Sequence, residues 1–106
     1  ILKSIATTIE KSIRVEDVLA RYGGEEFCCL LPETTLEAAV VLAERFRKNV
    51  AQKVYKYQGN SIKVTISLGV ASMQGEKMTA ENLLKKADQG LYEAKRTGRN
   101  RVVTMT

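Results

Sequence analysis

The segment VLARYGGEEFCCLL, residues 18–31, joins two apolar runs through a pair of glycines. Both runs are rich in β-branched, aromatic and other apolar residues, which favours strands over residues 17–22 and 27–31. Glycine adopts the positive φ angles of tight turns without strain, so Gly23 and Gly24 predict a β-hairpin. The next two residues, Glu25 and Glu26, are not needed for a turn, and their like charges repel each other. Their position at the tip indicates a bound cation or a chemical role.

The flanking sequence predicts helices on both sides of this hairpin. Isoleucine recurs every four residues within residues 1–13 and forms one apolar stripe on a helix. Thr34 with Glu37 fits a capping box, so a second helix should begin there. Thr79 is the predicted N-cap of a third helix, and Gly98 is the residue that follows its end. The buried face of the second helix is predicted to contain Leu36, Ala39, Val40, Ala43, Phe46 and Val50.

Further strands are predicted after the second helix. A short strand over residues 54–57 leads to the turn pair Gly59-Asn60, and apolar residues then alternate without a break over residues 62–70. Residues 101–104 can add a final strand. Helices alternating with strands and hairpins predict an α/β (α+β) fold, in which a central, mainly antiparallel sheet is flanked by helices.

Length and composition describe one globular domain or part of one. The chain has 106 residues, of which 44% are hydrophobic and 27% charged. It has no histidine, which excludes histidine-based acid–base catalysis and most zinc sites. The adjacent Cys28 and Cys29 are interpreted as reduced packing residues of a cytoplasmic protein. No apolar run approaches the roughly 20 residues of a membrane span, so this domain is expected to make no membrane contact.

Three ordered blocks of sequence indicate a family. DVLARYGGEEF, VTISLGVA and LLKKADQGLYEAKRTGRNRVV resemble the successive blocks of GGDEF domains, the bacterial diguanylate cyclases, in their GGEEF variant. The resemblance covers essentially the whole chain, residues 1–106, and implies a fold similar to nucleotidyl cyclases and polymerase palm domains.

The resemblance implies an enzyme that condenses two GTP molecules into cyclic di-GMP and releases pyrophosphate. It would work as a homodimer, because each domain presents one GTP. Glu25 and Glu26 are then the catalytic residues and ligands of Mg²⁺ (or Mn²⁺), whose preferred partners are hard oxygen atoms. Glu25 is the catalytic acidic residue, and Glu26 supports the positioning of the metal or the hydroxyl. Gly23 and Gly24 let the backbone come close to the nucleotide. The alternative is a solvated hairpin with two surface acids.

Two basic residues near the end of the third helix match positions that hold the triphosphate in this family. Lys95 and Arg99 are four residues apart and are therefore predicted to lie on about the same helix face. Lysine serves as a point charge and arginine as a planar fork for phosphate oxygens. The alternative is that both merely complement the negative end of the helix dipole.

A product-binding site is implied ahead of the hairpin. Arg14 and Asp17 form an RxxD motif, and five residues separate Asp17 from Gly23. In the family this motif, with a further arginine matched here by Arg45, binds cyclic di-GMP and inhibits the enzyme. Arginine can donate to O6 and N7 of guanine as well as to phosphate. An arginine paired locally with an aspartate is the simpler alternative.

The resemblance is incomplete at the start of the chain. Family members carry an earlier block with another metal-binding aspartate and the residues that recognise guanine. The sequence therefore looks like roughly the C-terminal two-thirds of a domain, and residues 1–106 alone are expected to be inactive. An upstream sensor domain is expected, and the full-length protein could be membrane-anchored. A catalytically silent domain that senses cyclic di-GMP or GTP is the main alternative. An RNA-binding domain ranks last, because only the net charge of +5 favours nucleic acid.

Overall fold

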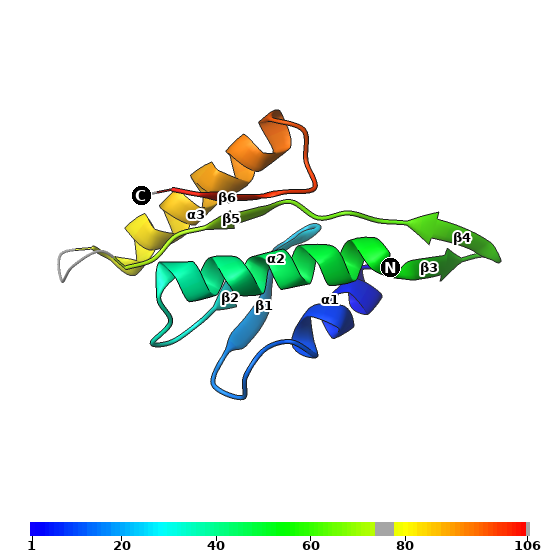
Figure 1. The fold of residues 1–106 in the computed structure, drawn as a ribbon, viewed down its shortest axis with the longest axis horizontal. Coiled ribbons are helices and arrows are strands. Elements are labelled where there is room, and N and C mark those ends of the chain that lie inside the picture. The colour runs from blue at the N-terminus through cyan, green and yellow to red at the C-terminus, as the bar shows by residue number, and fades with distance from the viewer. Residues whose placement is uncertain (74–77, 106) are drawn as a thin grey trace.

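The computed structural model describes residues 1–73 and 78–105. Figure 1 shows α2 crossing the middle of the molecule, with α3, β5 and β6 on one side of it and α1 on the other, while the β1–β2 hairpin runs behind α2. The elements of the described residues are, in chain order, α1 (Leu2–Glu10), β1 (Val18–Gly23), β2 (Glu26–Leu30), α2 (Leu36–Gln52), β3 (Val54–Tyr57), β4 (Asn60–Lys63), β5 (Leu68–Val70), α3 (Ala80–Arg96) and β6 (Val102–Thr104).

The strands of the described residues pair two by two. The pairs β1–β2 and β3–β4 are antiparallel hairpins, whereas β5 and β6 are parallel. The predicted α+β class and the predominance of antiparallel pairing are therefore confirmed. Within the described residues the pairs form three two-stranded sheets and not one continuous sheet.

The alternating run over residues 62–70 forms two strands, although one was predicted. β4 ends at Lys63, where its partner β3 begins, and β5 starts at Leu68 beside β6. Val64 and Ile66 lie between the two strands and still pack against the core. The alternation thus predicted burial correctly but not strand pairing. The turn before β4 is formed by Gln58 and Gly59, which have φ angles of 50° and 82°. The predicted turn pair was therefore wrong by one residue.

The helix ends agree with the sequence except at the start of α2. Thr35, not Thr34, is the N-cap, and its hydroxyl accepts a hydrogen bond of 3.1 Å from the Ala38 N–H. The prediction was wrong by one residue because either threonine could cap a helix that begins here. Thr79 caps α3 as predicted. Gly98 follows that helix with a φ angle of 129°, also as predicted.

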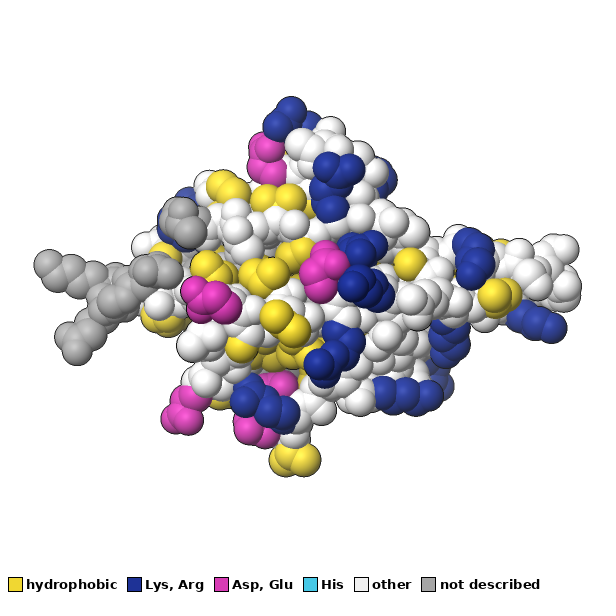
Figure 2. Space-filling model, in the orientation of Figure 1, with side chains coloured by type: hydrophobic (Ala, Val, Ile, Leu, Met, Phe, Trp, Pro, Cys, Tyr) yellow, Lys and Arg dark blue, Asp and Glu magenta, His cyan; other side chains and the backbone are white. Residues whose placement is uncertain are grey.

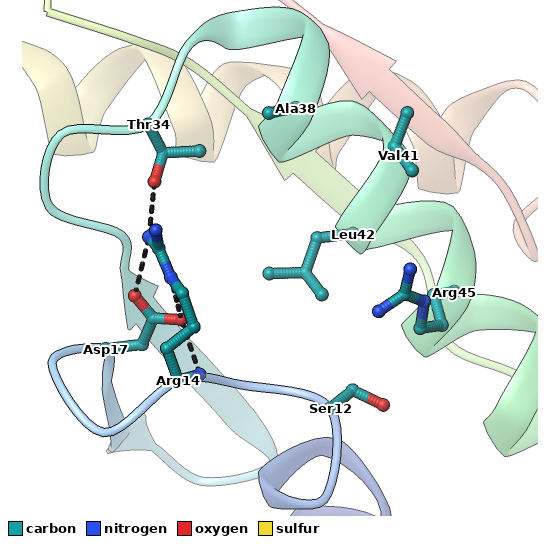
Figure 3. Close-up of a pocket in the computed structure, with 8 residues that line it drawn as sticks. All are labelled: Ser12, Arg14, Asp17, Thr34, Ala38, Val41, Leu42 and Arg45. Atoms are coloured by element: carbon teal, nitrogen blue, oxygen red, sulfur yellow. Dashed lines mark hydrogen bonds and ion pairs between the residues drawn. The ribbon is translucent and has the colours of Figure 1, made fainter.

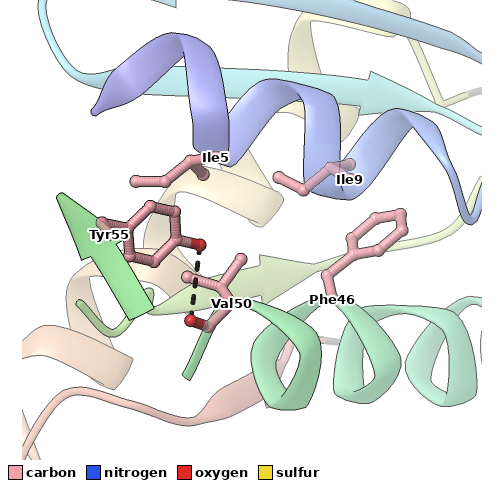
Figure 4. Close-up of a cluster of buried hydrophobic side chains, with 5 residues drawn as sticks. All are labelled: Ile5, Ile9, Phe46, Val50 and Tyr55. Carbon is pink, nitrogen blue, oxygen red and sulfur yellow. Dashed lines mark hydrogen bonds between the residues drawn. The ribbon is translucent and has the colours of Figure 1, made fainter. Parts of the chain in front are cut away.

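A buried cluster joins both N-terminal helices to β3 (Figure 4). Ile5 and Ile9 of the predicted stripe face this cluster, and Val50 of α2 has no exposed surface. The Tyr55 hydroxyl donates to the Val50 carbonyl at 3.4 Å, which satisfies its polar end inside the cluster. Of the predicted α2 face, four residues are buried: Ala39, Ala43, Phe46 and Val50.

The helix α3 lies unusually close to β5 and β6 through two glycines. A Cβ added to Gly69 would lie 2.0 Å from the Ala87 carbonyl oxygen and 2.2 Å from the Leu91 nitrogen. A Cβ added to Gly90 would lie 3.0 Å from the Gly69 Cα and 2.9 Å from the Val103 oxygen. The absence of side chains at both positions therefore sets how closely α3 packs on these strands.

Candidate functional site

The GGEEF segment forms the tip of the β1–β2 hairpin. Gly23 pairs with Glu26, and the turn between them consists of Gly24, with a φ angle of 36°, and Glu25. The Arg21 side chain reaches across the tip, and its Nε donates to the Gly24 carbonyl at 2.9 Å. Glu25 is exposed and Glu26 is half-buried. The tip is thus held from within the hairpin while both carboxylates remain accessible to solvent.

The two carboxylates fit a hard divalent cation only in part. Carboxylate oxygens are the ligands that Mg²⁺ and Mn²⁺ prefer. Among the described residues, however, no group of three or more His, Cys, Asp or Glu side chains is placed to hold a metal. Mg²⁺ is commonly bound by one or two carboxylates together with waters and substrate phosphates, so two carboxylates at one tip are within the usual number of protein ligands.

The sequence predicted that Lys95 and Arg99 share a helix face. The structure shows that they do not. The helix α3 ends at Arg96, and the Arg99 N–H turns back to donate to the Ala94 carbonyl at 2.8 Å. This hydrogen bond and the left-handed Gly98 close the helix, which puts Arg99 in the following loop. Within the described part of the chain, no hydrogen bond or ion pair joins either residue to Glu25 or Glu26.

The RxxD motif forms a closed turn between α1 and β1. The Asp17 N–H donates to the Arg14 carbonyl at 3.0 Å, and the Asp17 carboxylate accepts from the Arg14 N–H at 2.8 Å. The Arg14 guanidinium donates to the same carboxylate, with Nη2 at 3.0 Å from Oδ1. These side-chain hydrogen bonds, together with the one from the Arg14 backbone, lower the pKa of Asp17. The Asp17 side chain is fully buried, and it fixes one edge of the guanidinium.

Arg14 is also anchored to the segment before α2. Its Nη2 donates to the Thr34 hydroxyl at 2.6 Å and to the Pro32 carbonyl at 3.2 Å. About half of the Arg14 side chain nevertheless remains exposed (49%). The Arg14 Nη1 donates no hydrogen bond to any residue that the structure describes. The guanidinium is therefore oriented by the protein and still has donors available for a ligand.

A pocket of about 230 Å³ brings the three residues of the predicted product site together (Figure 3). Arg14 and Asp17 form one wall, and Arg45 extends from α2 on the other. Arg45 is exposed and makes no ion pair or hydrogen bond with the described residues. The pocket is lined by Ser12, Arg14, Asp17, Thr34, Ala38, Val41, Leu42 and Arg45. Two guanidinium groups beside an apolar wall suit an anionic ligand with flat rings.

The surface around α2 is mixed in character. Val41 lines the pocket although 62% of its surface is exposed, and Figure 2 shows hydrophobic side chains gathered over the middle of this face. Lys and Arg side chains lie on several elements of the same face, not along one of them. No helix of the described residues has the length and apolar character needed to cross a membrane.

Sequence reasoning missed three side-chain contacts near the predicted site residues. Thr34 was predicted as a helix cap, yet it binds Arg14 from 20 residues away. Arg21 was considered only as part of a strand, and its bond to Gly24 has no sequence signature. Arg47 reaches Asn100 across 53 residues. A long-range side-chain contact of this kind leaves no local pattern by which a single sequence could reveal it.

Comparison with known proteins gives a consistent set of relatives. The family profile described as "Diguanylate cyclase, GGDEF domain" matches residues 1–101. Diguanylate cyclase A of Treponema denticola is 45% identical over 102 residues, which cover 96% of this chain and 28% of that protein. Response regulator PleD of Caulobacter vibrioides is 42% identical over 105 residues, which cover 97% of this chain and 23% of that protein. The chain thus spans about a quarter of the length of these relatives.

Solved structures agree with this assignment. The GGDEF domain of DgcB from Caulobacter crescentus, crystallised in complex with c-di-GMP, matches with a TM-score of 0.90 and 28% identity, over 97% of this chain and 61% of that chain. The active GGEEF domain of a diguanylate cyclase from Vibrio cholerae matches with a TM-score of 0.87 and 32% identity, over 99% of this chain and 66% of that chain. The chain therefore belongs to the GGDEF domain family of diguanylate cyclases.

Proposed function

We propose that the protein is a diguanylate cyclase, which condenses two GTP molecules into cyclic di-GMP and releases two pyrophosphates. The observation that carries this proposal is the intact GGEEF tip. Glu25 and Glu26 are both present there, and Arg21 holds the turn at 2.9 Å from the Gly24 carbonyl. Two adjacent acids at a solvent-accessible tip repel each other, and a nucleotide-bound metal would offset that repulsion and give them a role.

The GGEEF tip offers candidate residues for metal binding and for activation of the attacking hydroxyl. Glu25 would lie near the attacking 3′-hydroxyl and help to remove its proton, with Glu26 beside it. Gly23 and Gly24 would let the nucleotide approach the backbone of the tip. Bound Mg²⁺ or Mn²⁺, held in part by the two carboxylates, would supply positive charge against the negative charge that develops at the α-phosphate. Because each domain presents one GTP, two copies must meet for the two attacks to occur.

The triphosphate would be held by Lys95 and Arg99. Lys95 is half-buried in the last turn of α3, and Arg99 is exposed in the loop that follows. A lysine offers a compact charge, whereas an arginine offers a planar set of donors to two phosphate oxygens. Their placement on two different local structures lets them approach one phosphate chain from different directions.

Product inhibition is the proposed role of the pocket formed by Arg14, Asp17 and Arg45. Its volume of about 230 Å³ is suited to part of a dinucleotide, with the remainder outside on the surface. The buried Asp17 would keep the Arg14 guanidinium oriented toward the ligand. The free Arg45 guanidinium would supply the second positive group.

A second candidate function is a silent domain that only binds cyclic di-GMP. It is favoured by one observation: a pocket of about 230 Å³ brings Arg14, Asp17 and Arg45 together, which is enough for product binding whether or not GTP is turned over. The two functions predict different behaviour of the natural, full-length protein. A cyclase makes cyclic di-GMP from GTP, and a sensor binds cyclic di-GMP without making it.

The test is the Glu25→Gln variant of the natural, full-length protein, incubated with GTP and Mg²⁺ or Mn²⁺. Product formation, measured by chromatography, should fall at least about a hundredfold, since a positioned acid–base group typically contributes this much. Glu10→Gln is the matched control, because Glu10 is an exposed acid on α1. Circular dichroism should show all three proteins equally folded. Undiminished product formation by the Glu25 variant would contradict the assigned role, and a wild-type protein that makes no product would favour the sensor.

A further inference from the structure

The loop between α3 and β6 has an unusual backbone (Figure 1). Three consecutive residues are left-handed: Gly98 with a φ of 129°, Arg99 with 64° and Asn100 with 47°. Glycine adopts this region freely and asparagine tolerates it, but an arginine there is uncommon. Such a conformation persists only where surrounding contacts hold it. Whatever holds this loop therefore determines where the Arg99 side chain can reach.

The loop is held partly by its own backbone. The Arg99 N–H donates to the Ala94 carbonyl at 2.8 Å, and the Arg101 Nε donates to the Arg99 carbonyl at 3.0 Å. A side chain from another element also reaches it. Arg47 of α2 donates from Nη1 to the Asn100 Oδ1 at 3.1 Å. This bond ties the loop to the central helix of the fold.

Arg47 is itself fixed on α2. Its Nε lies 3.1 Å from Oε1 of Glu44 and its Nη2 lies 3.0 Å from Oε2 of the same residue. Only 20% of the Arg47 side chain is exposed. The planar guanidinium thus uses one edge for Glu44 and presents the remaining nitrogen to Asn100. The Arg99 guanidinium, in contrast, makes no hydrogen bond with any described residue and is free to bind a ligand.

From this geometry we infer that Arg47 is a positioning residue, which holds the left-handed loop through Asn100 so that Arg99 points toward the GTP triphosphate. The inference rests on the proposed function, since it gives Arg99 its substrate. Arg47 itself would touch no substrate. Glu44 contributes indirectly, because its carboxylate fixes the Arg47 guanidinium that holds the loop.

The inference predicts a particular kinetic signature. A loop that loses the Arg47 bond keeps its backbone contacts but samples other conformations, so Arg99 meets the triphosphate less often. The triphosphate contact exists in both the ground state and the transition state, so KM for GTP should rise while kcat stays nearly constant. The Arg47–Asn100 bond is exposed at one end, so global stability should change little.

The experiment compares Arg47→Gln, Asn100→Gly and the double variant in the natural, full-length protein. Arg47→Gln should raise KM for GTP about fivefold, the equivalent of one ordinary hydrogen bond, with kcat within about twofold. Asn100→Gly removes the same bond while keeping a residue that accepts a left-handed backbone. The KM of the double variant should be no higher than that of the more affected single variant, because both substitutions break the same Arg47–Asn100 hydrogen bond. Strict additivity of the two effects would overturn the inference.

Arg96→Gln is the matched control. Arg96 pairs with Glu93 three residues earlier on α3 at 2.7 Å, as Arg47 pairs with Glu44, but forms no hydrogen bond to the loop. Equal KM values for the Arg47 and Arg96 variants would overturn the inference, because loss of one positive charge would then explain both. If Arg47→Gln fails to fold, Asn100→Gly tests the same bond from its exposed end.

A second readout does not need turnover. Trypsin cleaves after arginine, and Arg99 lies in the loop, so loosening the loop should speed cleavage at Arg99 in both single variants. The rate, followed by mass spectrometry, should match the wild type in the Arg96→Gln control. A wild-type protein without cyclase activity would refute the proposed function, while the cleavage rate would still test the role of Arg47. Faster cleavage with an unchanged KM in an active enzyme would refute the positioning role.

Discussion

Replacing Gly69 by alanine should damage this fold more than any comparable change at another glycine of the described chain. The added Cβ would lie 2.0 Å from the Ala87 oxygen, about 1.4 Å short of the ordinary contact distance of 3.4 Å. The atoms it meets belong to the α3 backbone and cannot rotate away. The helix would have to move off β5, which disturbs its packing along both strands. Overpacking typically costs about 1–3 kcal/mol, so a cost of about 3 kcal/mol or more is expected here.

Gly90→Ala gives a graded comparison from the other side of the same contact. Its Cβ would lie 2.9 Å from the Val103 oxygen, only about 0.5 Å too close. Alanine also favours the helical conformation over glycine by about 1 kcal/mol, which offsets part of the overpacking. The expected net cost is about 0–2 kcal/mol. Gly23→Ala is the control, because nothing lies within 4 Å of an added Cβ there.

Urea unfolding followed by circular dichroism measures all three variants. With a slope of about 1.5 kcal/mol per molar urea, a loss of 3 kcal/mol lowers the midpoint by about 2 M. Gly69→Ala should therefore unfold far earlier than Gly90→Ala, and Gly23→Ala should stay within about 0.5 kcal/mol of the wild type. A Gly69 variant with a midpoint within about 0.3 M of the wild type would refute the steric reasoning.

Two further predictions concern the product pocket and the thiols. Arg14→Ala should weaken cyclic di-GMP binding about tenfold or more, since it removes charge-assisted contacts. The control Lys48→Ala, on the exposed side of α2, should leave the affinity unchanged. If calorimetry finds the same affinity for the Arg14 variant as for the wild type, Arg14 has a purely structural role. Burial raises the pKa of the Cys29 thiol from 9.0 to about 11, so at pH 8 iodoacetamide should modify Cys29 about a hundredfold more slowly in the native than in the urea-unfolded chain. Because the thiol ionises at lower pH in the unfolded chain, the contribution of Cys29 to the stability of the fold is present below pH 9 and is lost between about pH 9 and 11. Equal alkylation rates in the native and unfolded chains would contradict the raised pKa of Cys29.

Much of the fold could be predicted because its signals are local. The hairpin follows from two glycines between apolar runs, and Thr79 and Gly98 mark the ends of α3 by capping chemistry. The choice between Thr34 and Thr35 could not be made locally, because each can cap a helix. In the structure the Thr34 hydroxyl accepts from Arg14 Nη2 at 2.6 Å, while the Thr35 hydroxyl accepts from the Ala38 N–H.

Other features depend on contacts between distant segments. Alternation over residues 62–70 reports which side chains are buried, but strand pairing depends on where β3 and β6 lie. Helical spacing placed Lys95 and Arg99 on one face, and the turn at Gly98 removed Arg99 from the helix. The close approach of Gly69 and Gly90 has no sequence signature either, since a glycine does not reveal its neighbours.

The helix α2 contributes an arginine both to the pocket and to the loop between α3 and β6. Arg45 and Arg47 are two residues apart, and an α-helix turns about 100° per residue, so their side chains leave the helix about 200° apart. Arg45 lines the pocket with Arg14, while Arg47 hydrogen-bonds the loop that carries Arg99. A ligand that moves α2 at the pocket would therefore also move the anchor of that loop. Thermodynamic linkage then sets a condition on any inhibition transmitted this way: if bound product weakens GTP binding by some factor, bound GTP must weaken product binding by the same factor.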